Sequence, residues 1–188
     1  MNLANKLTVS RIILACFFIL ILFVKSAGAK FFALAVFLAA CITDYYDGFI
    51  ARRNNSVTDF GMLMDPIADK ILILGGFLAF VEMKIIPAWM VMVIIARELL
   101  ITGIRLLALS QKKVLSAAIA GKHKTVSQMA AIFSILTFLI IRDSGFTFRY
   151  IGYYQKGIYI LMLITVIMTL TSGISYMIRN RHVFMGGR

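Results

Sequence analysis

The chain has 188 residues, of which 61% are hydrophobic and 15% charged, with 20 Lys and Arg against 8 Asp and Glu. Soluble domains use about 45–50% apolar residues, so this composition argues against a soluble domain and favours a membrane bundle. The net charge of +12 could indicate nucleic acid, but the basic residues stand in short loops between apolar runs. Because this placement fits lipid headgroups better, we expect no nucleic-acid partner.

Six apolar stretches follow one another along the chain, at about 7–24, 31–51, 61–81, 87–109, 125–141 and 157–178. Each is near the roughly 20 residues that a helix needs to cross a bilayer. The sequence therefore predicts an all-α integral membrane protein with six transmembrane helices. We expect residues 1–188 to form a single domain.

The first stretch has the layout of a signal peptide, since Lys6 and Arg11 precede the apolar run and Ala27 and Ala29 form an A-x-A-like site. We nevertheless expect it to be retained as the first membrane helix. The two cysteines stand inside apolar stretches without metal-ligand spacing, and we interpret them as small core residues.

The distribution of Lys and Arg predicts the orientation of the six helices. The side that would hold both termini carries twelve of these residues: Lys6, Arg11, Arg52, Arg53, Arg105, Lys112, Lys113, Lys122, Lys124, Arg179, Arg181 and Arg188. The other side carries six: Lys25, Lys30, Lys84, Arg142, Arg149 and Lys156. Basic loops remain in the cytoplasm, so we expect a multi-pass protein of the cell membrane with both termini cytoplasmic.

Five of the eight acidic residues fall within positions 43–70, at the predicted cytoplasmic interface: Asp44, Asp47, Asp59, Asp65 and Asp69. Asp44 and Asp47 are three residues apart and Asp65 and Asp69 are four apart, so each pair shares a helix face. Asp59 matches neither face and is interpreted as a surface charge. A short reversal at about 53–58 would bring the four paired carboxylates to one depth.

Four carboxylates in one place require counter-charge, and too few basic residues are interleaved to supply it. Divalent cations would supply it, because carboxylate oxygens suit Mg²⁺ or Mn²⁺. Two metals sharing carboxylates have the geometry that supports an in-line phosphoryl displacement. Pro66 fits the first turn of a helix capped by Asp65, or could instead kink a helix that begins near Thr58.

Small residues stand beside the acids at Gly48, Ala51 and Gly61. In membrane bundles such residues commonly allow close helix packing. They would also let a planar base or a pyrophosphate approach the backbone. The sequence leaves both interpretations open.

The pattern Asp44-x-x-Asp47-Gly48-x-x-Ala51-Arg52, then eight residues, then Gly61-x-x-x-Asp65-x-x-x-Asp69 resembles the full signature of the CDP-alcohol phosphatidyltransferase family. That family moves a phosphatidyl-type group from a CDP-linked lipid to an alcohol and releases CMP. The resemblance implies two divalent cations, Mg²⁺ or Mn²⁺, and a homodimer. The residues that it implies as metal ligands are Asp44, Asp47, Asp65 and Asp69, with Asp69 also the general base. Those that it implies for the CDP-lipid are Gly48, Ala51, Arg52, Gly61 and Thr8.

Three further stretches, 5–11, 96–105 and 121–128, resemble the phosphatidylglycerophosphate synthase branch of that family, whose acceptor is glycerol 3-phosphate. A phosphate acceptor needs cationic partners, which Arg and Lys supply. Arg105 and Lys124 are the preferred pair, and Arg97 and Thr125 complete the expected glycerol-phosphate site. Arg97 and Glu98 point about 100° apart on a helix and need not pair. Lys124 could instead be a topology signal, and Arg105 could extend to the interface.

The resemblance thus implies an enzyme of phospholipid biosynthesis that transfers the phosphatidyl group of CDP-diacylglycerol to glycerol 3-phosphate. Within the family, inositol phosphate, serine or phosphatidylglycerol could be the acceptor. Outside it, a Mg²⁺-dependent membrane prenyltransferase also uses paired Asp motifs, and a divalent-cation transporter would need intramembrane acids. A transporter should place these acids near the bilayer midplane, whereas the acids here stand at helix ends.

Overall fold

The computed structural model describes residues 3–54, 59–110, 120–145 and 151–181. It describes the side chains at these positions except for 3–9, 44–54, 59–66, 68–69, 109–110 and 120–123. Within these ranges the chain forms six helices: α1 (Leu3–Leu22), α2 (Ala27–Asn54), α3 (Asp59–Glu82), α4 (Ala88–Ser110), α5 (Ala120–Asp143) and α6 (Ile151–Arg179). The six predicted helices are confirmed, and most extend a few residues beyond the apolar stretches.

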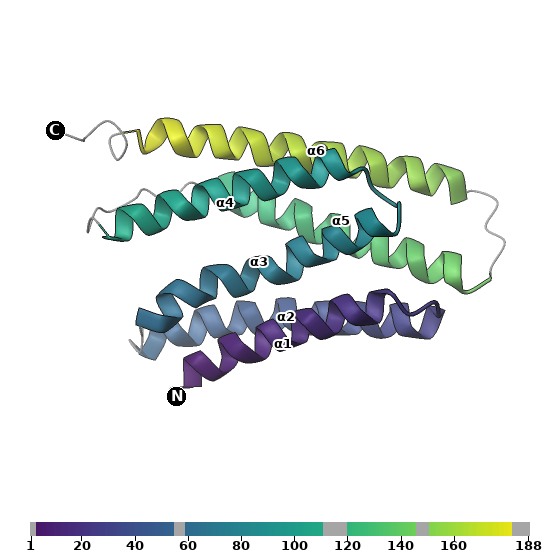
Figure 1. The fold of residues 1–188 in the computed structure, drawn as a ribbon, viewed down its shortest axis with the longest axis horizontal. Helices are drawn as coiled ribbons and strands as arrows, with labels where there is room; N and C mark the ends of the chain where they lie inside the picture. Colours follow the sequence, from purple (N-terminus) through teal and green to yellow (C-terminus); the bar gives the residue numbers. More distant parts are fainter. Residues whose placement is uncertain (1–2, 55–58, 111–119, 146–150, 182–188) are drawn as a thin grey trace.

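Successive helices run in opposite directions, so the start of α1, the ends of α2, α4 and α6 and the starts of α3 and α5 lie at one end of the bundle (Figure 1). We call this end the signature end, because residues 43–70 approach it. Helix α1 packs on α2 and α3, α5 packs on α2, α3 and α6, and α4 packs on α3 and α6. The structure therefore confirms that α1 begins and α6 ends on one side.

Large aromatic and aliphatic side chains fill the space between the helices, including Phe18, Phe37, Phe77, Phe80 and Leu136. Helix α1 approaches α3 closely at two glycines. A Cβ at position 75 would lie 2.4 Å from the Cδ1 atom of Ile19, and one at position 76 would lie 3.2 Å from the ring of Phe18. Small residues at such a crossing let two backbones approach, as is common between membrane helices.

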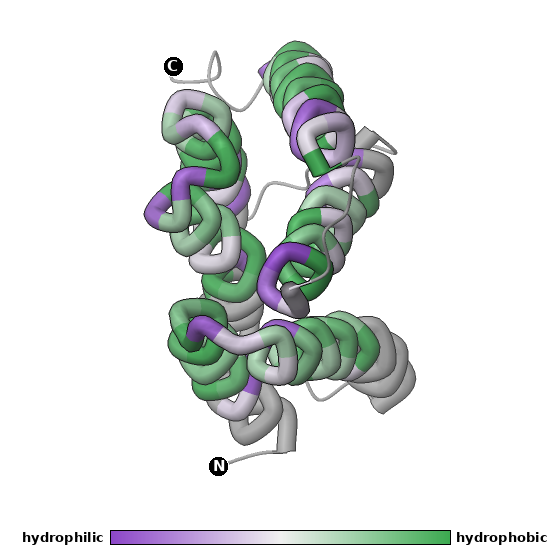
Figure 2. Tube along the Cα trace, turned by 90° about the vertical axis from the view of Figure 1, so that its right-hand side faces the viewer, coloured by the Kyte–Doolittle hydropathy of each residue, from purple (hydrophilic) through white to green (hydrophobic). Residues whose placement is uncertain are grey.

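The outer surface of the bundle is also apolar. Met92 is 70% exposed, Leu20 68% and Phe31 65%, and the colour of hydrophobic residues predominates over the coloured part of the tube in the end-on view of Figure 2. Among the described residues, two helical segments have the length and hydropathy of a membrane span, Lys124–Asp143 and Ile151–Arg179. Ser10–Leu22 and Ala27–Thr43 are shorter apolar segments. Such a surface fits a hydrocarbon environment.

The connection from α3 to α4 shows how local chemistry ends a helix. Lys84 has a φ of 57°, the Ile85 N–H donates to the Phe80 carbonyl at 3.0 Å, and the Lys84 N–H donates to the Val81 carbonyl at 2.9 Å. This is a Schellman motif with Lys84 in the left-handed position. Pro87 follows directly before α4, where its missing N–H is not needed.

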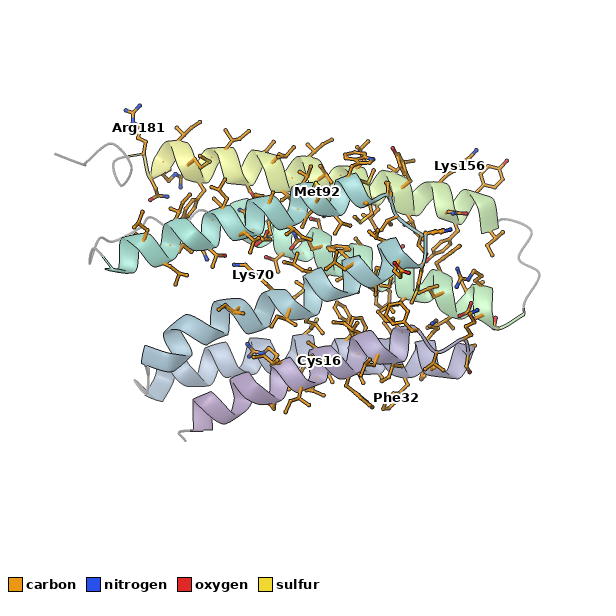
Figure 3. The ribbon with its side chains drawn as sticks, viewed as in Figure 1. Cys16, Phe32, Lys70, Met92, Lys156 and Arg181 are labelled. Atoms are coloured by element: carbon orange, nitrogen blue, oxygen red, sulfur yellow. The ribbon has the colours of Figure 1, made fainter. Side chains whose placement is uncertain are left out.

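Two expectations need correction. Helix α3 begins at Asp59, so Pro66 lies in its interior and Asp65 is not its N-terminal cap; the alternative of a helix that starts near Thr58 is the observed one. Cys16 is exposed on the outer face of α1, not in the core, while Cys41 is half-buried. Cys16 stands among residues of α1 that face outward, such as Phe17 and Leu20, so its sulfur faces the hydrocarbon side of the bundle (Figure 3).

Candidate functional site

The four paired aspartates lie on the two helices that meet at the signature end. Asp44 and Asp47 are in the second half of α2, and Asp65 and Asp69 are in the first half of α3. Residues 55–58 connect the two helices, so both segments approach the same end (Figure 1). The side chains of these four residues lie outside the described part of the structure. Their role as metal ligands, and that of Asp69 as general base, therefore stay predictions.

The expected CDP-lipid residues also lie on helices of this end: Thr8 on α1, Gly48, Ala51 and Arg52 on α2, and Gly61 on α3. Their side chains are outside the described residues. Among the side chains that the structure does describe, no group of three or more His, Cys, Asp or Glu could hold a metal ion. The donor chemistry of the four aspartates, all oxygen and all anionic, fits the hard divalent cations that the resemblance implies.

A buried polar cluster lies beside the acidic signature, between helices α3, α4, α5 and α6. At its centre, the Glu98 carboxylate of α4 accepts hydrogen bonds from Lys124 Nζ of α5 and, at 3.1 Å, from Arg97 Nη1. Glu98 and Lys124 are 5% and 7% exposed. An ionised group in a membrane helix is expensive unless it is paired, and here each of the three is paired.

The expectation that Arg97 and Glu98 need not pair is wrong for this structure. Although the two residues are neighbours on α4, both long side chains turn into the space between α4, α5 and α6 and meet there. Arg97 is fixed from a second side, because its Nη2 donates to Ser172 Oγ of α6 at 3.0 Å. Gly173 makes room for it, since a Cβ at this position would lie 3.0 Å from Arg97 Cγ.

Helix α3 adds a third cation to the cluster. Lys70 Nζ donates to the Thr102 hydroxyl, and this hydroxyl donates to the Glu98 backbone carbonyl at 2.7 Å. Figure 3 shows the Lys70 side chain in the space between α3 and α4. Lys70 directly follows Asp69 in the chain, so the cluster borders the acidic signature. Lys70, Arg97 and Lys124 thus place three cations around Glu98, the acidic side chain that the structure describes in this cluster.

Several buried polar atoms around this cluster lack a hydrogen-bond partner in the described structure: Arg97 Nε, Gln128 Nε2, Thr169 Oγ1 and Tyr176 Oη. Buried polar atoms are paired in the great majority of cases, so each such atom needs an explanation. A polar ligand or water between α4, α5 and α6 would supply the missing partners.

Arg105 lies apart from this cluster. It stands eight residues after Arg97 on α4, about 12 Å along the helix axis, and its guanidinium carbon lies 5.5 Å from the centre of the Tyr176 ring. Arg105 is exposed while Tyr176 is buried. The two preferred phosphate ligands thus have different partners, Tyr176 for Arg105 and Glu98 for Lys124. Thr125 follows Lys124 and is half-buried.

Sequence reasoning singled out neither Lys70 nor Ser172 and Gly173, and it gave Glu98 no role. The sequence nevertheless contains features that could have indicated these positions. Lys70 stands immediately after the signature, and the run 169–173 of α6 combines Thr, Ser and Gly within an apolar helix. Such polar and small residues in a membrane segment mark positions that face other helices.

An all-helical bundle with an apolar exterior and a buried ionic cluster at one end defines a polytopic membrane protein with a polar site. The chain belongs to the CDP-alcohol phosphatidyltransferase family, whose sequence profile matches residues 1–177. It is therefore an integral membrane protein of that family's helical fold.

Curated relatives cover most of the chain. A CDP-diacylglycerol–glycerol-3-phosphate 3-phosphatidyltransferase of Bacillus subtilis (strain 168) is 38% identical over 147 residues, which are 72% of this chain and 76% of the relative. The protein of the same name from Rickettsia bellii is 35% identical over 175 residues, 93% of each chain. A probable phosphatidylglycerophosphate synthase of Mycobacterium tuberculosis (strain H37Rv) is 34% identical over 181 residues, 95% of this chain and 81% of the relative.

Proposed function

We propose that the protein transfers the phosphatidyl group of CDP-diacylglycerol to glycerol 3-phosphate, giving phosphatidylglycerophosphate and CMP. The observation that carries this proposal is the similarity to relatives with this named activity over 72–95% of the chain. The buried cluster supports the choice of acceptor, because Arg97 and Lys124 place two cations beside the single carboxylate of Glu98 and a phosphate dianion needs cationic partners.

In the proposed reaction, a hydroxyl of glycerol 3-phosphate attacks the β-phosphorus of CDP-diacylglycerol, and CMP leaves. Asp69 accepts the hydroxyl proton. Two divalent cations held by Asp44, Asp47, Asp65 and Asp69 would supply charge neutralisation at the pyrophosphate. Gly48, Ala51, Arg52, Gly61 and Thr8 would contact the CDP-lipid.

The acceptor phosphate would bind at the polar cluster. Lys124 and Arg97 present their charges to the space between α4, α5 and α6, and we propose that Thr125, next to Lys124 on α5, also contacts the acceptor. Arg105, two turns from Arg97, would reach the acceptor from the signature end. Arg97 Nε and Gln128 Nε2 are buried without a hydrogen-bond partner in the described structure, which supports a polar ligand in this space.

We further propose that residues 1–188 act as one domain, that the chain forms a homodimer, and that its signature end faces the cytoplasm. The excess of Lys and Arg at that end supports the orientation. There the acyl chains of both lipid substrate and product would stay in the bilayer while the headgroup chemistry takes place at the interface.

The test is incubation of the purified protein with CDP-diacylglycerol and one alcohol at a time, with CMP release as the readout. Glycerol 3-phosphate should release CMP, whereas inositol phosphate, serine and phosphatidylglycerol should not. Release with a different alcohol would reassign the acceptor within the family. No release with any alcohol, while a diphosphate prenyl donor reacts, would contradict the proposed reaction.

A further inference from the structure

A polar pocket lies at the end of the bundle opposite to the signature end, where α1, α2, α3 and α5 meet. Its polar lining consists of Lys25, Lys30, Arg142 and Asp143, and its apolar wall includes Leu22 and Met83. The cavity has a volume of about 460 Å³, within the range of about 300–1,000 Å³ that is usual for ligand pockets.

Two of the polar residues, Lys30 and Asp143, are engaged in contacts within the protein. Lys30 is buried and its Nζ donates to the backbone carbonyls of Leu22 and, at 2.9 Å, Val24. Its ammonium lies 4.0 Å from the Asp143 carboxylate, which also accepts a hydrogen bond from Arg142 Nε at 3.0 Å. Lys30 and Asp143 are therefore occupied by contacts within the protein.

The other two cations have spare charge and spare donors. Lys25 is exposed, and no hydrogen bond or ion pair joins it to the described residues. The Arg142 side chain is 42% exposed, and within the described part of the chain only its Nε is engaged. With three cations against one carboxylate, the pocket carries a formal charge of +2.

We propose that this pocket binds the phosphate of an anionic phospholipid headgroup from the leaflet opposite to the reaction. The pocket combines cations with an apolar wall at the end of a membrane bundle, where lipid headgroups are concentrated. From position 30 to position 44, α2 advances 14 residues, about 21 Å at 1.5 Å per residue. The bound lipid is therefore a different molecule from the one that reacts at residues 43–70.

The experiment uses the full chain in uncharged detergent micelles, titrated with phosphatidylglycerol, with bound lipid measured by native mass spectrometry. The variant Lys25→Gln/Arg142→Gln removes two exposed cations and leaves Lys30 and Asp143 in place. Its Kd for phosphatidylglycerol should rise about 30-fold, or roughly fivefold for each cation removed. Lys25→Gln alone, which alters only an exposed side chain, should raise the Kd about fivefold.

The matched control is Lys156→Gln, which removes an exposed cation at the same end of the bundle but outside the pocket, where Lys156 lies over the Tyr153 ring (Figure 3). It should leave the Kd unchanged. Equal phosphatidylglycerol binding by the wild type and both pocket variants would overturn the proposal. So would a loss in Lys156→Gln equal to that in Lys25→Gln, because it would indicate general attraction to charge.

A second experiment distinguishes binding of a lipid in this pocket from binding of a soluble anion. Inorganic phosphate can bind at the proposed acceptor site, so in the same micelles it should raise the melting temperature of the wild type and of Lys25→Gln/Arg142→Gln equally, whereas phosphatidylglycerol should raise that of the wild type more. A rise with inorganic phosphate that disappears in Lys25→Gln/Arg142→Gln would overturn the lipid assignment. CMP release should be the same in this variant and the wild type, so failure of the proposed reaction and failure of this lipid site give different results.

Discussion

Glu98 determines how the charges of the buried cluster are arranged. Its carboxylate engages Lys124 and Arg97, and its backbone carbonyl is linked through Thr102 to Lys70. A buried ion pair adds little net stability, because desolvation offsets most of the attraction. Glu98 matters for positioning, because its carboxylate holds Arg97 and Lys124 in one polar space where the two cations outnumber the one carboxylate.

Replacing Lys124 by Ala should therefore weaken acceptor binding. The loss of a charge-assisted contact worth about 1.5–3 kcal/mol should raise the KM for glycerol 3-phosphate by about 10- to 150-fold. The KM for CDP-diacylglycerol should hardly change. Steady-state kinetics with each substrate varied in turn measures both values.

Two controls accompany this variant. Lys124→Ala removes one of the two cationic partners of Glu98. The charge-balanced variant Lys124→Met/Glu98→Gln is therefore measured beside it and should show the same rise in the KM for glycerol 3-phosphate. Arg181→Gln removes an exposed cation just beyond α6, at the same end of the bundle (Figure 3), and should leave both KM values unchanged. A rise in the KM for the CDP-lipid alone would mean that Lys124 belongs to the other substrate.

The proposed general base can be separated from the proposed metal ligands. Asp69→Asn keeps the shape of the side chain but cannot accept a proton, so turnover should fall by about 10²-fold or more. Bound metal and CDP-lipid should remain. Asp44→Ala and Asp65→Ala should lose metal and turnover together, and Asp59→Asn should change neither. Near-normal turnover of Asp69→Asn would remove this residue from the base role.

At the scale of the elements, the crossing of α4 and α6 depends on a glycine. Arg97 lies against Gly173, where an added Cβ would approach its Cγ to 3.0 Å and its Nε to 3.3 Å. A Cβ at position 173 would therefore require the Arg97 side chain to shift by a few tenths of an ångström from its position beside Ser172. The same helix has a glycine at 157 with no atom within 4 Å of the added Cβ, so the two positions form a natural comparison.

Gly173→Val should displace Arg97 from Ser172 and destabilise the protein by about 1–3 kcal/mol, the usual effect of overpacking. The KM for glycerol 3-phosphate should rise at the same time, because Arg97 loses its position. Gly157→Ala should be neutral or stabilising by up to about 1 kcal/mol, since Ala is the better helix former. Thermal unfolding and the two KM values provide the measurements. An unchanged melting temperature in Gly173→Val would contradict the close approach.

At the scale of the whole molecule, the acidic signature predicts dependence on a divalent cation. A chelator should abolish CMP release, and Mg²⁺ or Mn²⁺ should restore it, because four carboxylates at one end of the bundle lack enough basic partners. Ca²⁺, which prefers longer and more numerous oxygen contacts, is the comparison ion. Full turnover in the presence of chelator would contradict the two-metal proposal.

The number, order and direction of the helices could be predicted from the apolar stretches, because a bilayer demands spans of nearly constant length. Helix ends were less predictable, since α2 and α6 continue through polar residues such as Arg52 and Gln155 that hydropathy alone excludes. The partners of Lys124 and Arg105 could not be predicted. These contacts depend on how α4, α5 and α6 are rotated about their own axes relative to one another. That relative rotation cannot be derived from the sequence of a single helix.

Lys30 has a consequence for how the chain enters the membrane during synthesis. Its ammonium binds the carbonyls at the end of α1 from the first turn of α2, and Ser26 begins that turn by accepting the Lys30 N–H at 3.1 Å. The first two helices are thereby closed into a hairpin by contacts that lie entirely within residues 22–30. We expect such a hairpin to insert as one unit before α3 has left the ribosome, with the Lys30 ammonium already hydrogen-bonded and Lys25 as the charge at its tip that still has to cross the hydrocarbon.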